Sequence, residues 1–238
     1  MTKIIVGCPV KNDLESFQQM IESLLRSTIS YDKIVLVDGG STRPIQLAYY
    51  EQLKERNSKI EVYYLNTKTP LEAYNYLFRL AKEEKADLFL TQTDVVFPKL
   101  YKRDWLQIMS EVSKELNIGA VTCIGGGGTS GPDYVDGFNW LGGWCTYYPY
   151  STIKKIGGFD ESFPNGFGVD IDHSYRIHKA GLKIVQINYW VDHHQQNSRE
   201  HDNSPKAEEM KKASSEYFRK KWNLGEYTVM IDEEGWSQ

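Results

Sequence analysis

The chain has 238 residues, 40% of them hydrophobic, and a formal net charge of −4. This length is sufficient for the full core of a single α/β domain. The weakly acidic charge excludes a general basic field that would gather nucleic acid, so we expect no general nucleic-acid binding. The three cysteines (Cys8, Cys123 and Cys145) are odd in number and far apart, which favours free thiols in a reducing compartment.

The sequence has no candidate membrane segment. No window approaches the roughly 20 apolar residues that a membrane-spanning helix requires. The apolar run within Met1–Val6 is too short for a signal peptide. We therefore expect a soluble, cytoplasmic protein without a transmembrane segment, whose oligomeric state the sequence does not reveal.

Short apolar runs alternate with amphipathic stretches through the first half of the chain. The apolar runs predict strands over Lys3–Val10, Ile34–Val37, Ile60–Leu65, Leu88–Leu90 and Ile118–Ile124. The amphipathic stretches predict helices that begin after Asn12 or Asp13 and then cover Pro44–Asn57, Pro70–Glu84 and Pro98–Leu116. This alternation is typical of an α/β fold with a mainly parallel central sheet and helices on both of its faces.

Four loops follow the predicted strands of this sheet. In parallel sheets, the loops at the carboxyl ends of the strands line the ligand crevice. We therefore expect four loops to converge on one pocket, namely Pro9–Asp13, Asp38–Thr42, Asn66–Thr69 and Thr91–Val96.

The second half of the chain begins with a glycine-rich and an aromatic segment. Gly125–Gly128 predicts a loop, and it lacks the Lys-Ser/Thr pair of a phosphate-binding P-loop. Tyrosine and tryptophan are concentrated in Trp140–Tyr150. Such flat, partly polar rings suit either a sugar-binding cleft or a packed strand, and both interpretations stay open.

The last part of the chain predicts a strand and a surface helix. The strand covers Leu182–Val191, and the helix covers Pro205–Lys221. Phe218 and Trp222 lie four residues apart, so they can dock the helix on the body of the protein. The polar stretch Gln195–Ser204 is expected to be mobile when no ligand is bound.

Aspartates follow two predicted strands and open one predicted helix. Asp38 and Asp94 each follow a strand, whereas Asp170 and Asp172 lie at a helix start. Each has an ordinary explanation, because aspartate also stabilises its own turn or caps a helix. Asp170 and Asp172 are two residues apart, so at most one points into a cleft. We expect Asp38, Asp94 and Asp170, although far apart in the chain, to line one pocket.

The order of several motifs resembles glycosyltransferase family 2. Gly157–Glu161, a Gly-Gly-Phe-Asp-Glu turn, precedes the Asp-x-Asp pair at 170 and 172, as in the acceptor segment of these enzymes. Val37–Thr42 is similar to their Val-Asp-Asp-Gly-Ser-Thr signature, with Gly39 in place of one acid. Ala73-Tyr74-Asn75 resembles their Ala-Arg-Asn segment. Gln92-Thr93-Asp94 resembles their Asp-x-Asp motif, with Gln92 in place of the first acid.

The resemblance implies a GT-A-type fold, which is a single Rossmann-like domain. Residues 1–124 would bind the nucleotide-sugar, and residues 125–200 would hold the acceptor and the catalytic groups. Residues 201–238 would form a C-terminal helix and tail that pack on the same domain.

The resemblance also implies roles for individual residues. Asp170 would be the general base for the acceptor hydroxyl, with Trp144 and Asp172 beside the acceptor. Asp94 would hold Mn²⁺ or Mg²⁺ together with a histidine, His193 by register or His194 as a near equal. Asp38 would contact the base, uracil. The residues expected to bind the donor are Pro9, Val10, Asp38, Asn75, Gln92, Thr93 and Asp94.

The predicted function is therefore transfer of a sugar, with inversion and with a divalent metal, from a nucleotide-sugar such as a UDP-sugar. The acceptor would be a hydroxyl of a glycan, a lipid-linked sugar or another molecule. Gly39, Gln92 and Val169 each replace one acid of a doubled motif, which leaves open a non-catalytic protein that binds a nucleotide-sugar or glycan. A nucleotidyltransferase would need a glycine-rich basic loop after the first strand, and Gly7–Asn12 does not supply one.

Overall fold

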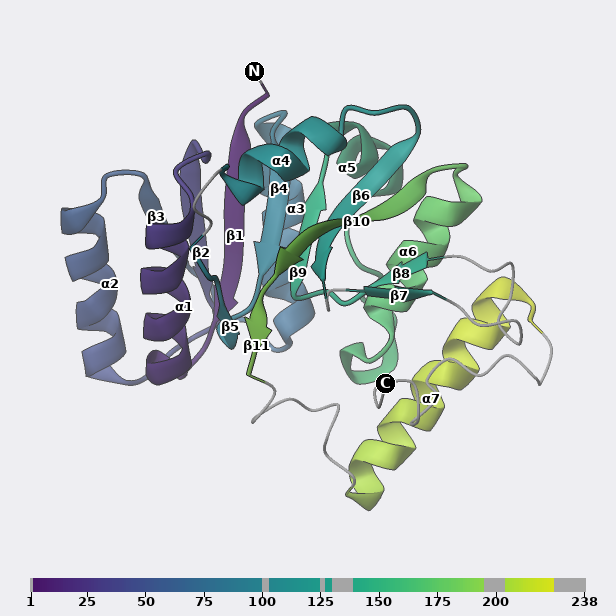
Figure 1. Cartoon of the computed structure of the whole chain (residues 1–238). Coiled ribbons are helices and arrows are strands. Elements are labelled where there is room, and N and C mark those ends of the chain that lie inside the picture. Colours follow the sequence, from purple (N-terminus) through teal and green to yellow (C-terminus); the bar gives the residue numbers. More distant parts are fainter. Residues whose placement is uncertain (1, 100–102, 125–126, 130–138, 195–203, 225–238) are drawn as a thin grey trace.

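A seven-stranded sheet forms the centre of the protein (Figure 1). The structure is a computed structural model that describes residues 2–99, 103–124, 127–129, 139–194 and 204–224. The strand order is β10-β6-β9-β4-β1-β2-β3, and within this sheet only β9 runs antiparallel to its neighbours, β4 and β6. The strands of the sheet are β1 (Ile4–Val10), β2 (Lys33–Asp38), β3 (Ile60–Tyr64), β4 (Asp87–Thr91), β6 (Ile118–Ile124), β9 (Cys145–Tyr148) and β10 (Lys183–Trp190).

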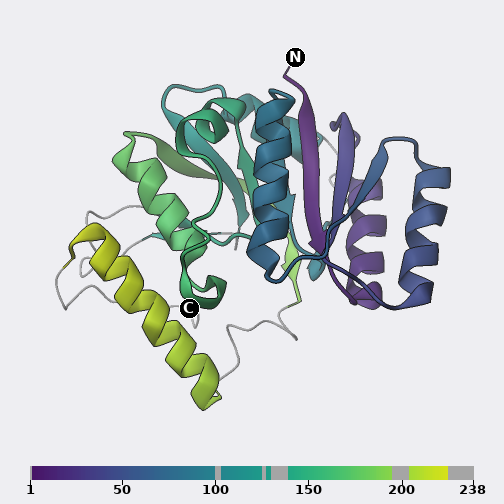
Figure 2. The same cartoon turned by 180° about the vertical axis from the view of Figure 1, so that it is seen from behind.

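Helices cover both faces of this sheet, as Figures 1 and 2 show from opposite sides. One face packs on α1, α2 and α4, and the other packs on α3, α5 and α6, with Phe218 of α7 in the same apolar cluster. The sequence prediction of a mainly parallel α/β sheet covered on both faces is therefore confirmed. The helices are α1 (Leu14–Ser27), α2 (Pro44–Arg56), α3 (Pro70–Glu83), α4 (Trp105–Val112), α5 (Tyr150–Ile156), α6 (Val169–Lys179) and α7 (Pro205–Trp222).

The near-continuous apolar strands are buried because helices lie on both sides of them. All residues of β2 and β4 are buried, as are all but one in β1. The three cysteines are buried free thiols, as the sequence predicts. None of the helices in the described ranges is long and apolar enough to cross a bilayer.

The aromatic segment at 140–150 contains the one strand of the seven-stranded sheet that the sequence analysis did not assign. Cys145–Tyr148 forms β9, which lies between β4 and β6 and is entirely buried. The Tyr147 hydroxyl donates a hydrogen bond of 2.6 Å to the carboxylate of Asp87. Most of this segment therefore packs in the core, and Gly143 and Trp144, just before the strand, line a cavity.

Two expected elements differ from the structure. The helix predicted over 98–116 is shorter, because Asp104 caps it and accepts hydrogen bonds from the backbone N–H groups of Leu106 and Gln107. Part of the glycine-rich segment forms β7 (Gly127–Thr129), which pairs with β8 (Asn139–Leu141). The remaining residues of that segment, and the polar stretch at 195–203, lie outside the described residues.

A second two-stranded sheet lies beside the main one and fixes the residues that follow β4 and β10. It consists of β5 (Val95–Val96) and β11 (Asp192–His193), with His193 opposite Val95. Because Asp94 directly precedes β5, this pairing brings the side chains of Asp94 and His193 together.

The C-terminal helix α7 docks on the body as the sequence predicts. Phe218 is buried and meets the ring of Tyr175 at 5.7 Å, and Trp222 meets the same ring at 4.8 Å. A 3₁₀ turn at Pro164–Gly166 lies against α7, where the Ser214 hydroxyl donates to the carbonyl of Pro164.

His173 of α6 makes stability depend on pH. Its ring is buried among Phe78, Tyr148 and Phe159, and Nε2 lies 2.9 Å from the carbonyl oxygen of Gly157. Burial, followed by the nearby positive charge of Arg176, lowers the pKa of His173 to about 3. The unfolded chain therefore takes up a proton near pH 6.5, whereas the folded chain stays neutral down to about pH 3.

We expect His173 to reduce the free energy of unfolding as the pH falls from 6.5 towards 3, by at most about 1.4 kcal/mol per pH unit. Above pH 6.5 it has no such effect, because both states are neutral. Urea denaturation between pH 7 and 4.5 should give a shallower slope for His173→Gln than for the wild type. The exposed His194 provides the control: His194→Gln should keep the wild-type slope, and equal slopes for all three proteins would contradict this assignment.

Candidate active site

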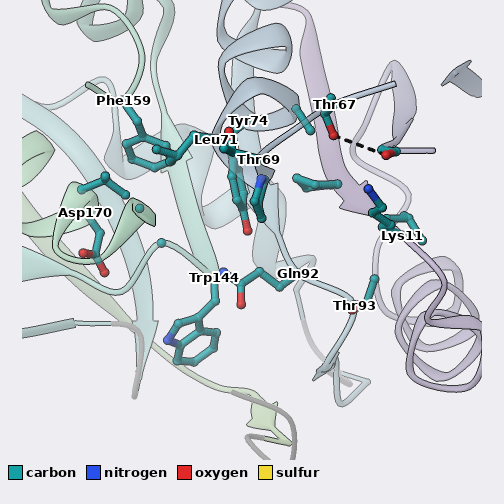
Figure 3. A pocket seen from close by; sticks show the side chains of 18 of the residues that line it. Lys11, Thr67, Thr69, Leu71, Tyr74, Gln92, Thr93, Trp144, Phe159 and Asp170 are labelled. Atoms are coloured by element: carbon teal, nitrogen blue, oxygen red, sulfur yellow. Dashed lines mark hydrogen bonds between the residues drawn. The ribbon is translucent and has the colours of Figure 1, made fainter. Parts of the chain in front are cut away.

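One cavity of about 580 Å³ opens at the carboxyl ends of β1, β2 and β4 (Figure 3). Its lining includes residues from all four of the loops that the sequence analysis expects to converge. The second half of the chain contributes Trp144, Phe159, the start of α6 and His193. The convergence of the four loops on one pocket is therefore confirmed.

Asp94 and His193 form a pair of potential metal ligands in this cavity. The Nε2 atom of His193 lies 3.4 Å from Oδ2 of Asp94, and the imidazole stacks on Trp144 with 4.2 Å between ring centroids. Oδ1 of Asp94 and both ring nitrogens of His193 are buried and have no hydrogen-bond partner among the described residues. Buried polar atoms normally have partners, so this pair fits an ion that would bind between them.

Hard carboxylate oxygen and neutral imidazole are suitable ligands for Mn²⁺. The described part of the chain holds no cluster of three or more His, Cys, Asp or Glu side chains. His194 is exposed and contributes only its backbone N–H, which donates to the carbonyl of Asp94 at 2.8 Å. His193 is therefore the histidine that the structure places in the cavity.

Four of the expected donor-binding residues line the cavity beside this pair. Pro9 and Val10 end β1, and Gln92 and Thr93 follow β4. The Thr93 hydroxyl donates to Asp13 at 2.6 Å, which ties the loop after β4 to the start of α1. Gln92 points towards Trp144 and Tyr74 (Figure 3).

Asp170 lines the cavity from the first turn of α6. Gly168 is the N-cap residue directly before this helix, and its φ of +70° is a left-handed conformation that favours glycine. Oδ1 of Asp170 accepts a hydrogen bond of 2.9 Å from the backbone N–H of Ile171. Figure 3 shows Asp170 and Phe159 on the side of the cavity opposite Lys11 and Thr93. The carboxylate of Asp170 lines the same cavity as the Asp94–His193 pair.

Asp172, expected beside the acceptor, faces away from the cavity. It is fully buried and accepts hydrogen bonds from Arg176 Nε at 3.0 Å and from Trp222 Nε1 at 2.8 Å. The ammonium of Lys221 lies 2.7 Å from Oδ1 of Asp172, the same oxygen that accepts the hydrogen bond from Trp222. The sequence analysis was right that 170 and 172 cannot share a direction, and the structure assigns Asp172 to the contact between α6 and α7.

Asp38, expected to contact the nucleobase, also lies outside the main cavity. It is 2% exposed, and Oδ1 accepts hydrogen bonds from the backbone N–H groups of Gly40 and Ser41 at 2.9 and 2.7 Å. Oδ2 accepts a hydrogen bond of 2.8 Å from the hydroxyl of Tyr50. Asp38 borders a neighbouring cavity of about 430 Å³. Of the three aspartates expected in one pocket, only Asp94 and Asp170 share it, and Asp38 stabilises its own turn.

Asn75, a further expected donor-binding residue, instead holds the Gly-Gly-Phe-Asp-Glu turn. Its amide makes hydrogen bonds with the backbone N–H and carbonyl of Phe159, at 2.7 and 2.9 Å, and with the carboxylate of Glu161. A Cβ atom at Gly158 would collide with the side-chain oxygen of Asn75, which explains the glycine there. Asn75 thus positions Phe159, which does line the cavity.

Sequence reasoning gave no role to several side chains that line the cavity, among them two lysines and a tyrosine. Lys11 follows β1, Lys68 follows β3, and Tyr74 lies in the second turn of α3. Their segments were all singled out, but the residues themselves were given no role. Tyr74 follows Leu71 by three residues, a helical spacing that places it on the same inward face and could have identified it.

A mainly parallel sheet whose strand ends form one crevice, with a carboxylate after β4 and another at the start of α6, defines a GT-A type of domain. The chain belongs to glycosyltransferase family 2, because the family model "Glycosyl transferase family 2" matches residues 5–150, more than half of its length. No curated protein matches the sequence.

Solved structures support the same fold. A mannosyltransferase from Pyrobaculum calidifontis, in complex with GDP-Man and Mn²⁺, is 15% identical with a TM-score of 0.60 over 79% of this chain and 55% of its own. GalNAc-T7 with UDP, GalNAc and Mn²⁺ is 14% identical, with a TM-score of 0.63. The match covers 98% of this chain and 56% of GalNAc-T7. S. aureus TarS is 14% identical, with a TM-score of 0.57. The match covers 78% of this chain and 35% of TarS. The chain therefore spans only about a third to a half of the length of these structures.

Proposed function

We propose that the protein transfers a sugar from a nucleoside-diphosphate sugar to an acceptor hydroxyl, with inversion at the anomeric carbon. The observation that carries this proposal is the presence of the Asp94–His193 pair and of Asp170 in one cavity of about 580 Å³. This volume lies within the range of roughly 300–1,000 Å³ that is typical of small-molecule sites.

The chemistry assigns a separate task to each group. Asp94 and His193 would hold a divalent ion, which stabilises the charge that develops on the diphosphate as the bond to the sugar breaks. Asp170 accepts the proton of the acceptor hydroxyl while the acceptor oxygen bonds to the anomeric carbon. The electrons of the broken sugar–phosphate bond leave with the diphosphate. Attack from the side opposite the diphosphate inverts the anomeric centre through an oxocarbenium-like state.

The nucleotide of the donor can be uridine or guanosine diphosphate, and the acceptor can be one of several hydroxyl compounds. The resemblance to family 2 favours a UDP-sugar, but the contact that supported uracil belonged to Asp38, which is buried outside the main cavity. One similar structure holds UDP and another holds GDP-Man. We therefore propose a nucleoside-diphosphate sugar and test both nucleotides, with a glycan, a lipid-linked sugar or another hydroxyl compound as acceptor.

The proposal is tested by binding and by turnover. UDP-glucose, UDP-N-acetylgalactosamine and GDP-mannose would be titrated into the protein with Mn²⁺, and release of the nucleoside diphosphate would be followed over hours. Binding with slow hydrolysis or transfer supports a transferase. Binding without any release over the same time would favour a non-catalytic binding protein, and the absence of binding would reject both.

Turnover is expected to depend on a divalent metal ion. We expect a chelator to reduce release of the nucleoside diphosphate at least about 100-fold, since a divalent ion contributes several kcal/mol to stabilisation of the leaving group. Added Mn²⁺ or Mg²⁺ should restore the rate. Asp94→Asn and His193→Ala should raise the Mn²⁺ concentration required for half-maximal rate, whereas His194→Ala should not. Full activity in the chelator would remove Asp94 and His193 from this role.

A further inference from the structure

Tyr74 projects into the middle of the cavity, between the groups assigned to the two ends of the reaction. It lies on the inward face of α3, and its ring meets the edge of Phe159 with 5.6 Å between centroids. Figure 3 shows the phenol between Asp170 and Phe159 on one side and Lys11 and Thr93 on the other, with its hydroxyl directed towards Gln92.

The surroundings of this phenol keep it protonated. Burial, together with the negative charges of Asp94 and Asp170, raises the pKa of Tyr74 well above its usual range, and a hydrogen bond with the Gln92 side chain opposes this increase only in part. The hydroxyl of Tyr74 therefore remains a hydrogen-bond donor at every pH at which the protein would work.

Gln92 lies beside that donor, because the hydroxyl of Tyr74 is directed towards the Gln92 side chain (Figure 3). A carboxylate at position 92 could only accept the phenol proton, whereas the amide group of a glutamine can donate to the phenol oxygen. A hydroxyl has one proton and two lone pairs, so a phenol that accepts from the amide keeps its proton for another acceptor. The glutamine is thus compatible with a Tyr74 hydroxyl that donates into the cavity.

The position of the donor identifies what would accept it. The diphosphate would bind at Asp94, which follows Thr93 in the chain, and the acceptor oxygen would lie at Asp170, across the cavity from Thr93 (Figure 3). Only the transferred sugar lies between these two in an in-line reaction. Building on the function proposed above, we propose that Tyr74, beside Gln92, donates a hydrogen bond to a hydroxyl group of the transferred sugar and so contributes to donor selection.

The experiment compares the nucleotide with the nucleotide-sugar. Binding of UDP, GDP and the donor that the wild type binds most tightly among UDP-glucose, UDP-N-acetylgalactosamine and GDP-mannose would be measured by calorimetry with Mn²⁺. Tyr74→Phe should weaken binding of the nucleotide-sugar about tenfold, the effect of one lost hydrogen bond, and leave binding of the free nucleoside diphosphate unchanged.

Tyr76 provides the matched control on the same helix. Its ring packs on Tyr63 at 5.1 Å and does not line the cavity, so Tyr76→Phe should bind all ligands as the wild type does. Equal weakening of nucleoside diphosphate and nucleotide-sugar in Tyr74→Phe would place Tyr74 at the diphosphate and overturn the inference, as would unchanged binding of both. If the wild type binds no nucleotide-sugar, the function proposed above fails, and the inference fails with it.

Discussion

Asp170→Asn is expected to reduce sugar transfer on the order of 10³-fold, the contribution of a well-placed general base. Asparagine has nearly the same shape as aspartate but cannot accept the proton of the acceptor hydroxyl. Asp170 lies across the cavity from Thr93, the residue before Asp94 (Figure 3). The affinity for the donor should therefore stay within about twofold of the wild type, a change of less than 0.5 kcal/mol. Initial rates of transfer and calorimetric titration of the donor measure the two quantities separately.

A matched control for this variant is Glu209→Gln, which removes one exposed carboxylate of α7 and should leave both quantities unchanged. The assignment of Asp170 is rejected if its asparagine variant loses donor binding but turns over each bound donor at the wild-type rate. In that case Asp170 would contact the donor, and another group would have to deprotonate the acceptor.

The sequence was sufficient to predict the fold because long apolar strands alternate with amphipathic helices. β1, β2 and β4 are buried on both faces, so their central residues had to be apolar, and this is the pattern that was recognised. The exception is β9, where Cys145–Tyr148 could equally have lined a cleft. Its place between β4 and β6 depends on pairing with strands far away in the sequence, which no local pattern reports.

The same limit explains which site residues could be predicted. A position after a parallel strand is enough to place Asp94 in the crevice, because the strand ends meet there whatever the side chains do. The direction of a side chain is different, since it depends on distant partners. Asp38 turns towards Tyr50 of α2, and Asn75 turns towards Phe159, more than 80 residues further along the chain. Neither partner can be identified from the sequence around Asp38 or Asn75.

Asp172→Ala is expected to lower the free energy of unfolding by about 3–5 kcal/mol, since it removes one partner from a buried ion pair. The carboxylate is fully buried and is contacted by Arg176, Lys221 and Trp222. Without it, Lys221 keeps only Asp160 as an anionic partner among the described residues, and the guanidinium of Arg176 keeps only carbonyl acceptors there. Urea denaturation of the variant and of the wild type at pH 7 measures this difference.

The cause can be separated from a simple loss of packing. If the cost comes from repulsion between the two cations that shared this carboxylate, then adding Lys221→Met to Asp172→Ala should recover part of the lost stability. Lys212→Met, on the exposed face of the same helix, should recover none. If neither substitution restores stability, the loss is due to the missing volume of Asp172, and the electrostatic explanation is wrong.

The same contact links stability to catalysis. Asp172 lies two residues after Asp170 on α6, and Lys221 also binds Asp160 of the Gly-Gly-Phe-Asp-Glu turn at 2.8 Å. Burial opposes ionisation of Asp160, but Lys221, Ser162 and Tyr217 outweigh it and lower the pKa of Asp160 to about 2, so this attachment is intact at neutral pH. Helix α7, which lies beyond residues 5–150, therefore fixes both segments that carry Asp170 and Phe159. In conditions where Asp172→Ala is still folded, its transfer rate should fall while its affinity for the nucleoside diphosphate is unchanged.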